Sequence, residues 1–195
     1  MTRNDDSQIA DRYLGGKLLI ASPSIGDPRF DRTVILMCDH SEDHAMGIVL
    51  NKPADGLRLP TLLKQLGIES ERAAPDRAVL VGGPVERDRG FVLHSADFES
   101  DESTLPISDT IGLTATKDAL EAIASPRPPQ RSLLALGYSG WGAGQLEEEL
   151  ASNAWFVADA DDDLIFAELA DSKWERAMEL LGIDPERLSS LSGNA

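Results

Sequence analysis

The stretch that decides the fold is LLALGYSGWGAGQLEEELASNAWF, from Leu133 to Phe156. It begins as an apolar run, passes through a glycine-rich segment and continues as a helical pattern that ends in an aromatic residue. Glycine lets the backbone enter positive-φ regions and approach another group closely. We therefore expect a strand that turns abruptly into a helix over Gly137–Gly144, the kind of turn at which α/β proteins often carry a nucleophile or a phosphate-binding loop.

The composition is that of an ordinary globular protein. The chain has 195 residues, of which 42% are hydrophobic and 27% charged, so a single domain with one core is expected over residues 1–195. We expect residues 1–12 and 189–195 to be flexible. There is no apolar leader and no apolar run of membrane-spanning length, and the single cysteine, Cys38, suits a reducing compartment. These features predict a cytoplasmic protein with no membrane partner.

The charge distribution argues against a nucleic-acid partner. The formal net charge is −16 and the isoelectric point is about 4.4. No basic residue occurs between Arg131 and Lys173, whereas acidic residues are frequent there, so the glycine segment is expected to lie in a negative field. Affinity for nucleic acids comes largely from Lys and Arg side chains that neutralise phosphates. Direct binding to nucleic acid is therefore not expected.

Short β-branched and apolar runs predict strands, several of which pair as hairpins. The three expected hairpins join residues 33–38 with 46–50, 77–82 with 91–94, and 155–158 with 164–167. Two further strands are expected at 17–22 and 107–116. Helices are expected at 60–66, after Thr116, after the glycine segment and after Ser172, where Glu175 completes a capping box. Hairpins interspersed with single helices favour an α+β fold with a mixed sheet over a doubly wound parallel sheet.

The glycine segment matches two catalytic patterns only in part. The sequence around Ser139 nearly forms a G-x-S-x-G nucleophile elbow, but the closing glycine comes one residue late, at Gly142, and all histidines precede the serine. Ser139 could still be assembled with His40 or His94 in another chain order. A phosphate-binding loop is disfavoured because the Walker lysine is missing and three glutamates open the following helix. The structural alternative is a tight corner that lets helix and sheet pack closely.

The loop after the first hairpin strand carries potential metal ligands, but their spacing fits no metal motif. These residues are Asp39, His40, Glu42, Asp43 and His44. We expect them to be solvated, with no bound metal and no cofactor. Cys38 and His40 would share one face of a strand, an arrangement that could generate a thiolate, although a buried and inert cysteine is the favoured interpretation. A hydrogen-bonded structural histidine is favoured over a catalytic base for His94.

Three long motifs together resemble one known family. They are GKLLIASPSIGDPRFDRTVILMCDHSEDHAMGIVLNKP, VLVGGPVERDRGFVLHS and LALGYSGWGAGQLEEELASNAWF, and with their spacing they cover the chain from about Tyr13 to Ile183. This set is similar to the AlgH/YqgE family of bacterial proteins. The resemblance implies a single α+β domain whose mixed sheet closes partly into a small β-barrel with helices packed around it. Two positions depart from the family pattern: His44 replaces a usual glycine, and Gly142 replaces a larger polar residue.

The resemblance implies little about function, because the family is carried as uncharacterised proteins or as proposed transcriptional regulators without established catalytic residues. We expect a regulatory or binding module that acts through a protein or small-molecule partner; the alternative is an enzyme of unknown reaction near Gly137–Gly144. Loops rich in small, polar and aromatic residues are typical of pockets. The candidate site combines such residues from distant segments: Asp39, His40, Asn51, Gly82, Gly83, Pro84, Arg89, Tyr138, Ser139 and Trp141.

Overall fold

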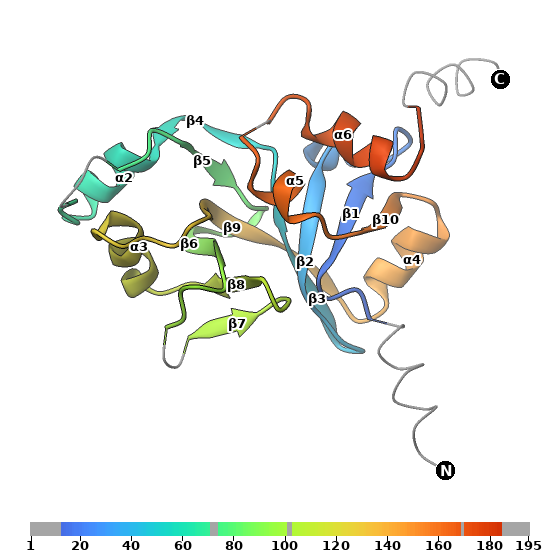
Figure 1. Cartoon of the computed structure of the whole chain (residues 1–195). Coiled ribbons are helices and arrows are strands. Elements are labelled where there is room, and N and C mark those ends of the chain that lie inside the picture. The colour runs from blue at the N-terminus through green and yellow to red at the C-terminus, as the bar shows by residue number, and fades with distance from the viewer. Residues whose placement is uncertain (1–12, 71–73, 101–102, 169, 185–195) are drawn as a thin grey trace, which may run out of the picture.

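The computed structural model describes residues 13–70, 74–100, 103–168 and 170–184 (Figure 1). Its strands are β1 (Lys17–Ala21), β2 (Val34–His40), β3 (His44–Val49), β4 (Pro53–Arg58), β5 (Ala78–Val81), β6 (Val85–Ser95), β7 (Thr104–Pro106), β8 (Ile111–Thr114), β9 (Ser132–Gly142) and β10 (Trp155–Asp159). Its helices are the short 3-10 helix η1 (Pro28–Phe30) and α2 (Leu59–Gln65), α3 (Lys117–Ala124), α4 (Gln145–Ala151), α5 (Asp162–Phe166) and α6 (Lys173–Leu180). The ends predicted to be flexible, 1–12 and 189–195, lie outside the described residues. Within the described part of the chain, none of the helices combines the length and apolar character needed to cross a membrane.

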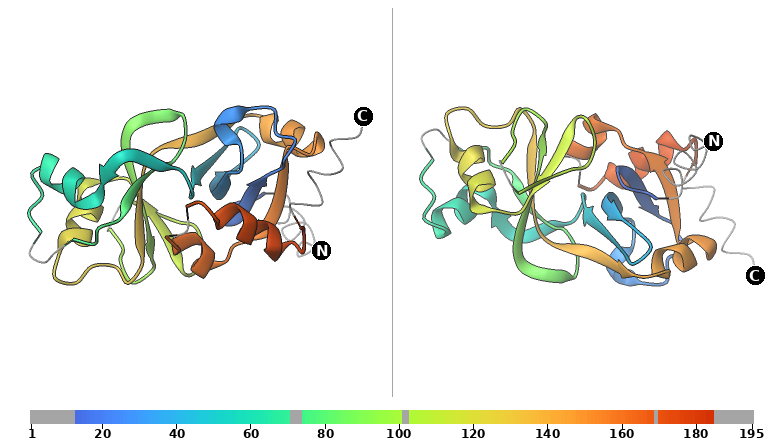
Figure 2. Two further views of the ribbon diagram at one scale, coloured as in Figure 1. Left: turned by 90° about the horizontal axis from the view of Figure 1, so that it is seen from above. Right: turned by 90° about the horizontal axis from the view of Figure 1, so that it is seen from below.

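The strands form one curled, mostly antiparallel sheet. Its order is β10-β1-β2-β3-β9-β6-β8-β7, and β5 joins it by pairing with β9 in parallel and with β4 on its other side. Because β10 and β7 end this order without pairing with each other, the sheet curls without closing (Figures 1 and 2). Helix α4 contacts β9 and β10, and α6 contacts β1 and β2. The prediction of an α+β fold with a mixed sheet is confirmed, and the partial barrel is an open one.

Strand β9 is shared by the two halves of the sheet. Its residues 139–142 pair with β3, whereas residues 132–136 pair with β6 and residues 135–136 also pair with β5. One half therefore contains β10, β1, β2 and β3 with α4, α5 and α6. The other half contains β4 to β8 with α2 and α3, on the opposite side of β9 (Figure 2). Strand β9, with which the stretch 133–156 begins, is therefore central to the sheet, whereas β10, with which that stretch ends, is the last strand at one edge.

Strands β1 and β2 are buried on both faces, which explains their uninterrupted apolar sequences. Successive strand residues point to opposite faces. Leu18 and Ile20 belong to the largest core cluster together with α5 and α6, whereas Leu19 and Ala21 belong to a second cluster that contains Trp155. A third cluster packs α2 and α3 against β6 and β9. Burial on two faces excludes the alternating pattern of a half-exposed strand.

The first predicted hairpin is confirmed, because β2 and β3 pair in an antiparallel manner. The predicted abrupt passage from strand to helix is confirmed, but the turn occupies only residues 143–144, because β9 continues to Gly142 and α4 begins at Gln145. Close packing accounts for Gly83 and Gly137, but not for Gly142 or Gly144, which have open space: a Cβ on Gly83 would lie 2.1 Å from the carbonyl carbon of Tyr138. Gly137 itself has φ +72°, and a Cβ there would lie 2.7 Å from two carbonyl oxygens of the 83–85 turn. The glycine-rich segment is thus a strand that another backbone crosses closely.

The other two predicted hairpins are wrong. Strand β5 pairs with β4 and β9, and β6 pairs with β8 and β9, so β9 separates the two segments that were expected to pair. Residues 164–167 belong mostly to helix α5, because the side chain of Asp161 accepts a hydrogen bond from the Leu164 amide at 2.7 Å and starts a helix. Strand β4 was not predicted, since its sequence PADGLR has no apolar run. The expected strand 107–116 is reduced to β8.

The predicted capping box of α6 does not form. Ser172 makes no side-chain hydrogen bond to the helix, and Glu175 pairs with Arg32. A tertiary contact anchors the helix: the indole Nε1 of Trp174 donates to the carbonyl oxygen of Ala21 at 2.8 Å. The position of α6 is therefore set by β1, with Trp174 as the link.

Candidate functional site

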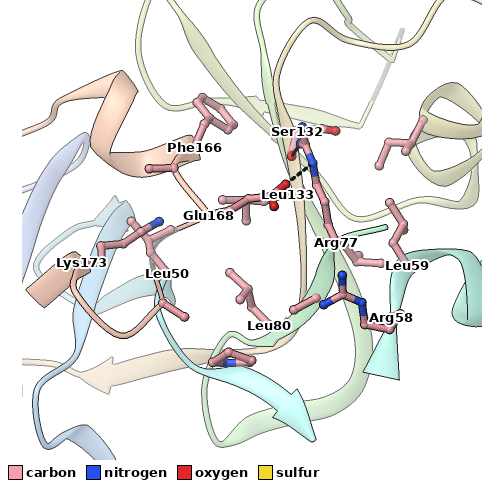
Figure 3. Close-up of a pocket in the computed structure, with 16 residues that line it drawn as sticks. Leu50, Arg58, Leu59, Arg77, Leu80, Ser132, Leu133, Phe166, Glu168 and Lys173 are labelled. Atoms are coloured by element: carbon pink, nitrogen blue, oxygen red, sulfur yellow. Dashed lines mark hydrogen bonds and ion pairs between the residues drawn. The ribbon is translucent and has the colours of Figure 1, made fainter. Parts of the chain in front are cut away.

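The structure encloses a cavity of about 310 Å³ between the two halves of the fold (Figure 3). We call it the Lys173 cavity. It lies between the largest core cluster, which provides Leu50 and Leu80, and the cluster under α2 and α3, which provides Leu59 and Ile123. Its remaining lining residues are Pro53, Arg58, Arg77, Ala78, Ser132, Leu133, Leu134, Phe166, Ala167, Glu168, Ala170 and Lys173. This size and mainly apolar lining are typical of small-molecule sites.

Lys173 is the buried charge of this cavity. It begins α6, directly before the anchoring Trp174, and is only 1% exposed. Its Nζ donates to the carbonyl oxygen of Ile165, in the last turn of α5, at 2.8 Å. Among the described residues, no carboxylate pairs with this ammonium group. Burial lowers the pKa of Lys173 from 10.5 to about 8, because the charged form loses hydration.

Two arginines complete the polar lining. The Nε of Arg77 lies 2.6 Å from the Oε1 of Glu168, and its Nη1 donates to the carbonyl oxygen of Ser132 at 2.9 Å. Arg58 pairs with Asp76, and this hydrogen bond holds the pKa of the Asp76 carboxyl below its usual value. Figure 3 shows both arginines on the wall across from Lys173. The lining therefore has three cationic side chains and one carboxylate, in a protein with a net charge of −16.

The residues predicted from the sequence lie elsewhere, and three of them share a surface groove. Arg89, Tyr138 and Trp141 line a groove of about 470 Å³ together with His44 and Phe91. We call it the Trp141 groove. Its other lining residues are Ala45, Met46, Val85, Ser103, Leu105, Leu113, Ala115 and Gly140. Part of the predicted convergence is thus present, on a shallow surface.

Ser139 and its glycine neighbours serve the packing of the sheet. Ser139 is fully buried, and its Oγ donates to the carbonyl oxygen of Gly82 at 3.4 Å. Gly82 and Gly83 lie directly against residues 137–139. Pro84 follows as an exposed turn residue. Within the described part of the chain, no base is hydrogen-bonded to this hydroxyl, which is held by a carbonyl oxygen of the sheet.

The remaining predicted residues are hydrogen-bonded in structural roles. His40 accepts from the Leu14 amide at Nδ1, and its Nε2 lies 2.9 Å from Glu147. Asp39 lies 2.8 Å from the Nε2 of His44. Asn51 accepts from the Val34 amide and donates to the carbonyl oxygen of Arg32, so it closes the turn before β2. Trp141 donates to Glu149 at 2.9 Å.

The nucleophile and metal hypotheses gain no geometric support. Burial raises the pKa of the Cys38 thiol to about 12, and its Sγ lies 3.5 Å from the carbonyl oxygen of Leu36. The Nε2 of His94 lies 2.9 Å from the Oγ1 of Thr114 in the core. Among the residues that the structure describes, no three His, Cys, Asp or Glu side chains are grouped so that they could hold a metal ion. A reactive thiolate at Cys38 and a catalytic base at His94 would both require surroundings other than these.

Lys173 is not among the residues predicted from the sequence, although a weak signal for it is present there. Lys173 precedes the buried Ala177 by four residues and Trp174 by one, so it lies on the apolar face of its helix. It is also the first basic residue after the long acidic interval from Arg131. A lysine on the buried face of an amphipathic helix is unusual enough to mark a site.

The fold and site define a class of small α+β proteins with a curled open sheet and a ligand-sized cavity at the junction of its halves. The model of the AlgH-like family, DUF179, matches residues 18–186. The chain belongs to the AlgH-like family. It is 54% identical over 184 residues to a UPF0301 protein of Caulobacter vibrioides, covering 94% of both chains. A UPF0301 protein of Ruegeria pomeroyi is 56% identical over 183 residues, which cover 93% of this chain and 99% of the relative.

Solved structures agree with this assignment. The solution structure of the AlgH protein from Pseudomonas aeruginosa matches with a TM-score of 0.73 and 40% identity, covering 94% of this chain and 95% of that one. A crystal structure of a protein from Corynebacterium diphtheriae matches with a TM-score of 0.69 at 20% identity, covering 90% and 91% of the two chains. The second likeness concerns the fold alone. The family resemblance expected from the three motifs is confirmed.

Proposed function

We propose that the protein is a regulatory binding module whose small-molecule ligand occupies the Lys173 cavity. The observation that supports this most directly is the fully buried Lys173, without a carboxylate partner among the described residues, in the wall of a cavity of about 310 Å³. Burying a charge costs free energy unless it is paired. A ligand that approaches this ammonium would offset the cost, which gives the residue a role beyond packing.

A binding role is favoured over catalysis. The alternative, an enzyme of unknown reaction near Gly137–Gly144, would need a nucleophile within hydrogen-bonding reach of a base. Ser139 is bonded to the Gly82 carbonyl, and His40 is bonded to Leu14 and Glu147. A binding module requires only a shaped cavity with a few polar groups. We also expect that the protein does not bind DNA directly and that it is located in the cytoplasm. Both expectations are predictions based on charge and composition.

A neutral fluorescent probe tests whether the cavity takes ligands. N-phenylnaphthylamine should bind to the folded protein in an equimolar ratio and become fluorescent as it leaves water. The Ala78→Phe variant fills the cavity from β5 and should lose this binding, whereas Ala143→Phe, in the exposed turn before α4, should retain it. Circular dichroism establishes that both variants are folded. Absence of probe binding to the unaltered protein, or equal binding to a folded Ala78→Phe variant, would contradict the proposal.

A further inference from the structure

We propose that the ligand of the Lys173 cavity is an amphipathic anion, with an apolar body and one carboxylate or similar acidic group that pairs with Lys173. This inference rests on the proposed function and names its ligand class. It follows from the donors of Lys173, the charges on the opposite wall and the apolar surface between them.

The ammonium group of Lys173 has unused hydrogen-bonding capacity. A lysine ammonium carries three N–H donors. Among the described residues, only the carbonyl oxygen of Ile165 accepts from it. A carboxylate would supply both a charge partner and an acceptor, and charge-assisted hydrogen bonds of this kind are stronger than neutral ones. The residue that faces the cavity is therefore complementary to an anion.

The charges around the cavity also favour an anion. Arg77 and Arg58 lie on the wall across from Lys173 (Figure 3), and the carboxylates of Glu168 and Asp76 already pair with them. The side chain of Glu168 is 62% exposed and that of Asp76 is 77% exposed, so both ion pairs are well solvated. Exposed pairs contribute little stability and rearrange at low cost. Neither carboxylate pairs with the buried Lys173.

The space between the charged groups is apolar. Leu50, Leu59, Leu80, Ile123 and Phe166 line it. Apolar surface of this kind binds a hydrocarbon chain or ring through the hydrophobic effect. A small hydrophilic anion such as inorganic phosphate would leave this surface unfilled. The ligand should therefore combine a hydrocarbon body with its acidic group.

Displacement of N-phenylnaphthylamine by a matched pair of compounds tests the inference. Decanoate and decyl alcohol have the same hydrocarbon chain and differ in the anionic group. Decanoate should displace the probe at concentrations at least about tenfold lower than decyl alcohol at pH 7. In Lys173→Met this preference should disappear, whereas Lys64→Met, on the exposed side of α2, should keep it.

The pH dependence provides a second test that needs no variant. The other charged groups that line the cavity with Lys173 are Arg58, Arg77 and Glu168. Lys173 loses its proton between pH 7 and pH 9.5, since its pKa is about 8. The affinity for decanoate should fall by about tenfold or more over this range, and that for decyl alcohol by less than about twofold.

The outcomes separate the two proposals. Equal displacement by both compounds at pH 7 would overturn the anionic ligand while leaving a small-molecule cavity in place. Failure of the probe to bind the unaltered protein would overturn both. A preference for decanoate that persists in a folded Lys173→Met variant, or that does not change between pH 7 and pH 9.5, would overturn the role of Lys173.

Discussion

The Lys173 cavity and the Trp141 groove differ in how their polar side chains are satisfied. In the Trp141 groove, the indole of Trp141 donates to Glu149, and Arg89 pairs with Glu86. In the Lys173 cavity, a fully buried ammonium has a single carbonyl acceptor among the described residues. Polar residues that stand out in a sequence can already have their hydrogen-bond partners within the fold. A functional site is better recognised by a group whose partners are incomplete.

We expect the largest loss of stability from a substitution at Gly83, where two backbones pass each other closely. In Gly83→Ala the new Cβ would lie 2.1 Å from the carbonyl carbon of Tyr138, which forces two backbones apart. We expect a loss of folding free energy above about 3 kcal/mol, measured by urea denaturation. Gly142→Ala is the matched control, because nothing lies within 4 Å of a Cβ there. Equal stability of the two variants would show that the crossing at Gly83 does not constrain the strand.

Lys173→Met should stabilise the protein at pH 7. The pKa of Lys173 falls from 10.5 to about 8 in the folded state, so the burial penalty is fully present below pH 8 and disappears as pH rises to 10.5. The shift corresponds to a gain of up to about 3 kcal/mol on substitution, reduced by the lost hydrogen bond to Ile165. Urea denaturation at pH 7 and pH 10 measures it, and the gain should be smaller at pH 10.

The exposed Lys117→Met serves as the control for this experiment and should change stability by less than about 0.5 kcal/mol at both pH values. A Lys173→Met variant that is less stable than the unaltered protein at pH 7 would mean that Lys173 is a structural cap of α5. The contrast between cavity and groove would then lose its basis.

Trp141→Phe should cost about 1 kcal/mol and leave ligand binding intact. The substitution removes the indole donor to Glu149, whose carboxylate keeps hydrogen bonds from Trp155 at 2.7 Å and from Gln145 at 3.1 Å. Binding of N-phenylnaphthylamine should change by less than about twofold, because Trp141 does not line the Lys173 cavity. A large loss of probe binding in a folded Trp141→Phe variant would place the ligand in the groove.

The smallest effect is expected from alkylation, because Cys38 should not react in the folded protein. The thiol is buried and its pKa is raised to about 12, so almost none of it is thiolate at pH 8. Iodoacetamide should leave the folded protein unmodified and alkylate it only in denaturing urea, as measured by mass spectrometry. Rapid labelling under native conditions would restore the thiolate hypothesis.

Local sequence patterns predicted the elements that depend on neighbouring residues. The apolar runs located β1, β2 and β3, and the pairing of β2 with β3 follows from the short loop between them. The pairing of β5 with β9 was beyond such reasoning, because it joins Leu80 to Ala135 across a large sequence separation. That Gly137 lies within a strand depends on the 83–85 backbone packed against it, a tertiary contact that the local glycine spacing does not reveal.

The candidate site shows the same division. Of the residues grouped from the sequence, Arg89, Tyr138 and Trp141 line one groove because they lie on the neighbouring strands β6 and β9, while their role as a site stays a prediction. Sequence reasoning missed the Lys173 cavity because the cavity is a space between α5, α6, β4 and β5, and β4 was not predicted. A cavity depends on how helices and strands pack against one another, and this packing cannot be derived from residue types alone.

The strand order of the sheet also determines when each strand can find its neighbours while the ribosome synthesises the chain. Among the described strands β1 is synthesised before all others, but one of its two neighbours, β10, comes from residues 155–159, well over a hundred residues later. During synthesis one edge of β1 therefore stays open until most of the chain has been translated. Open strand edges invite pairing with other chains. Nascent chains that stall before Trp155 are the species that we expect to require chaperones.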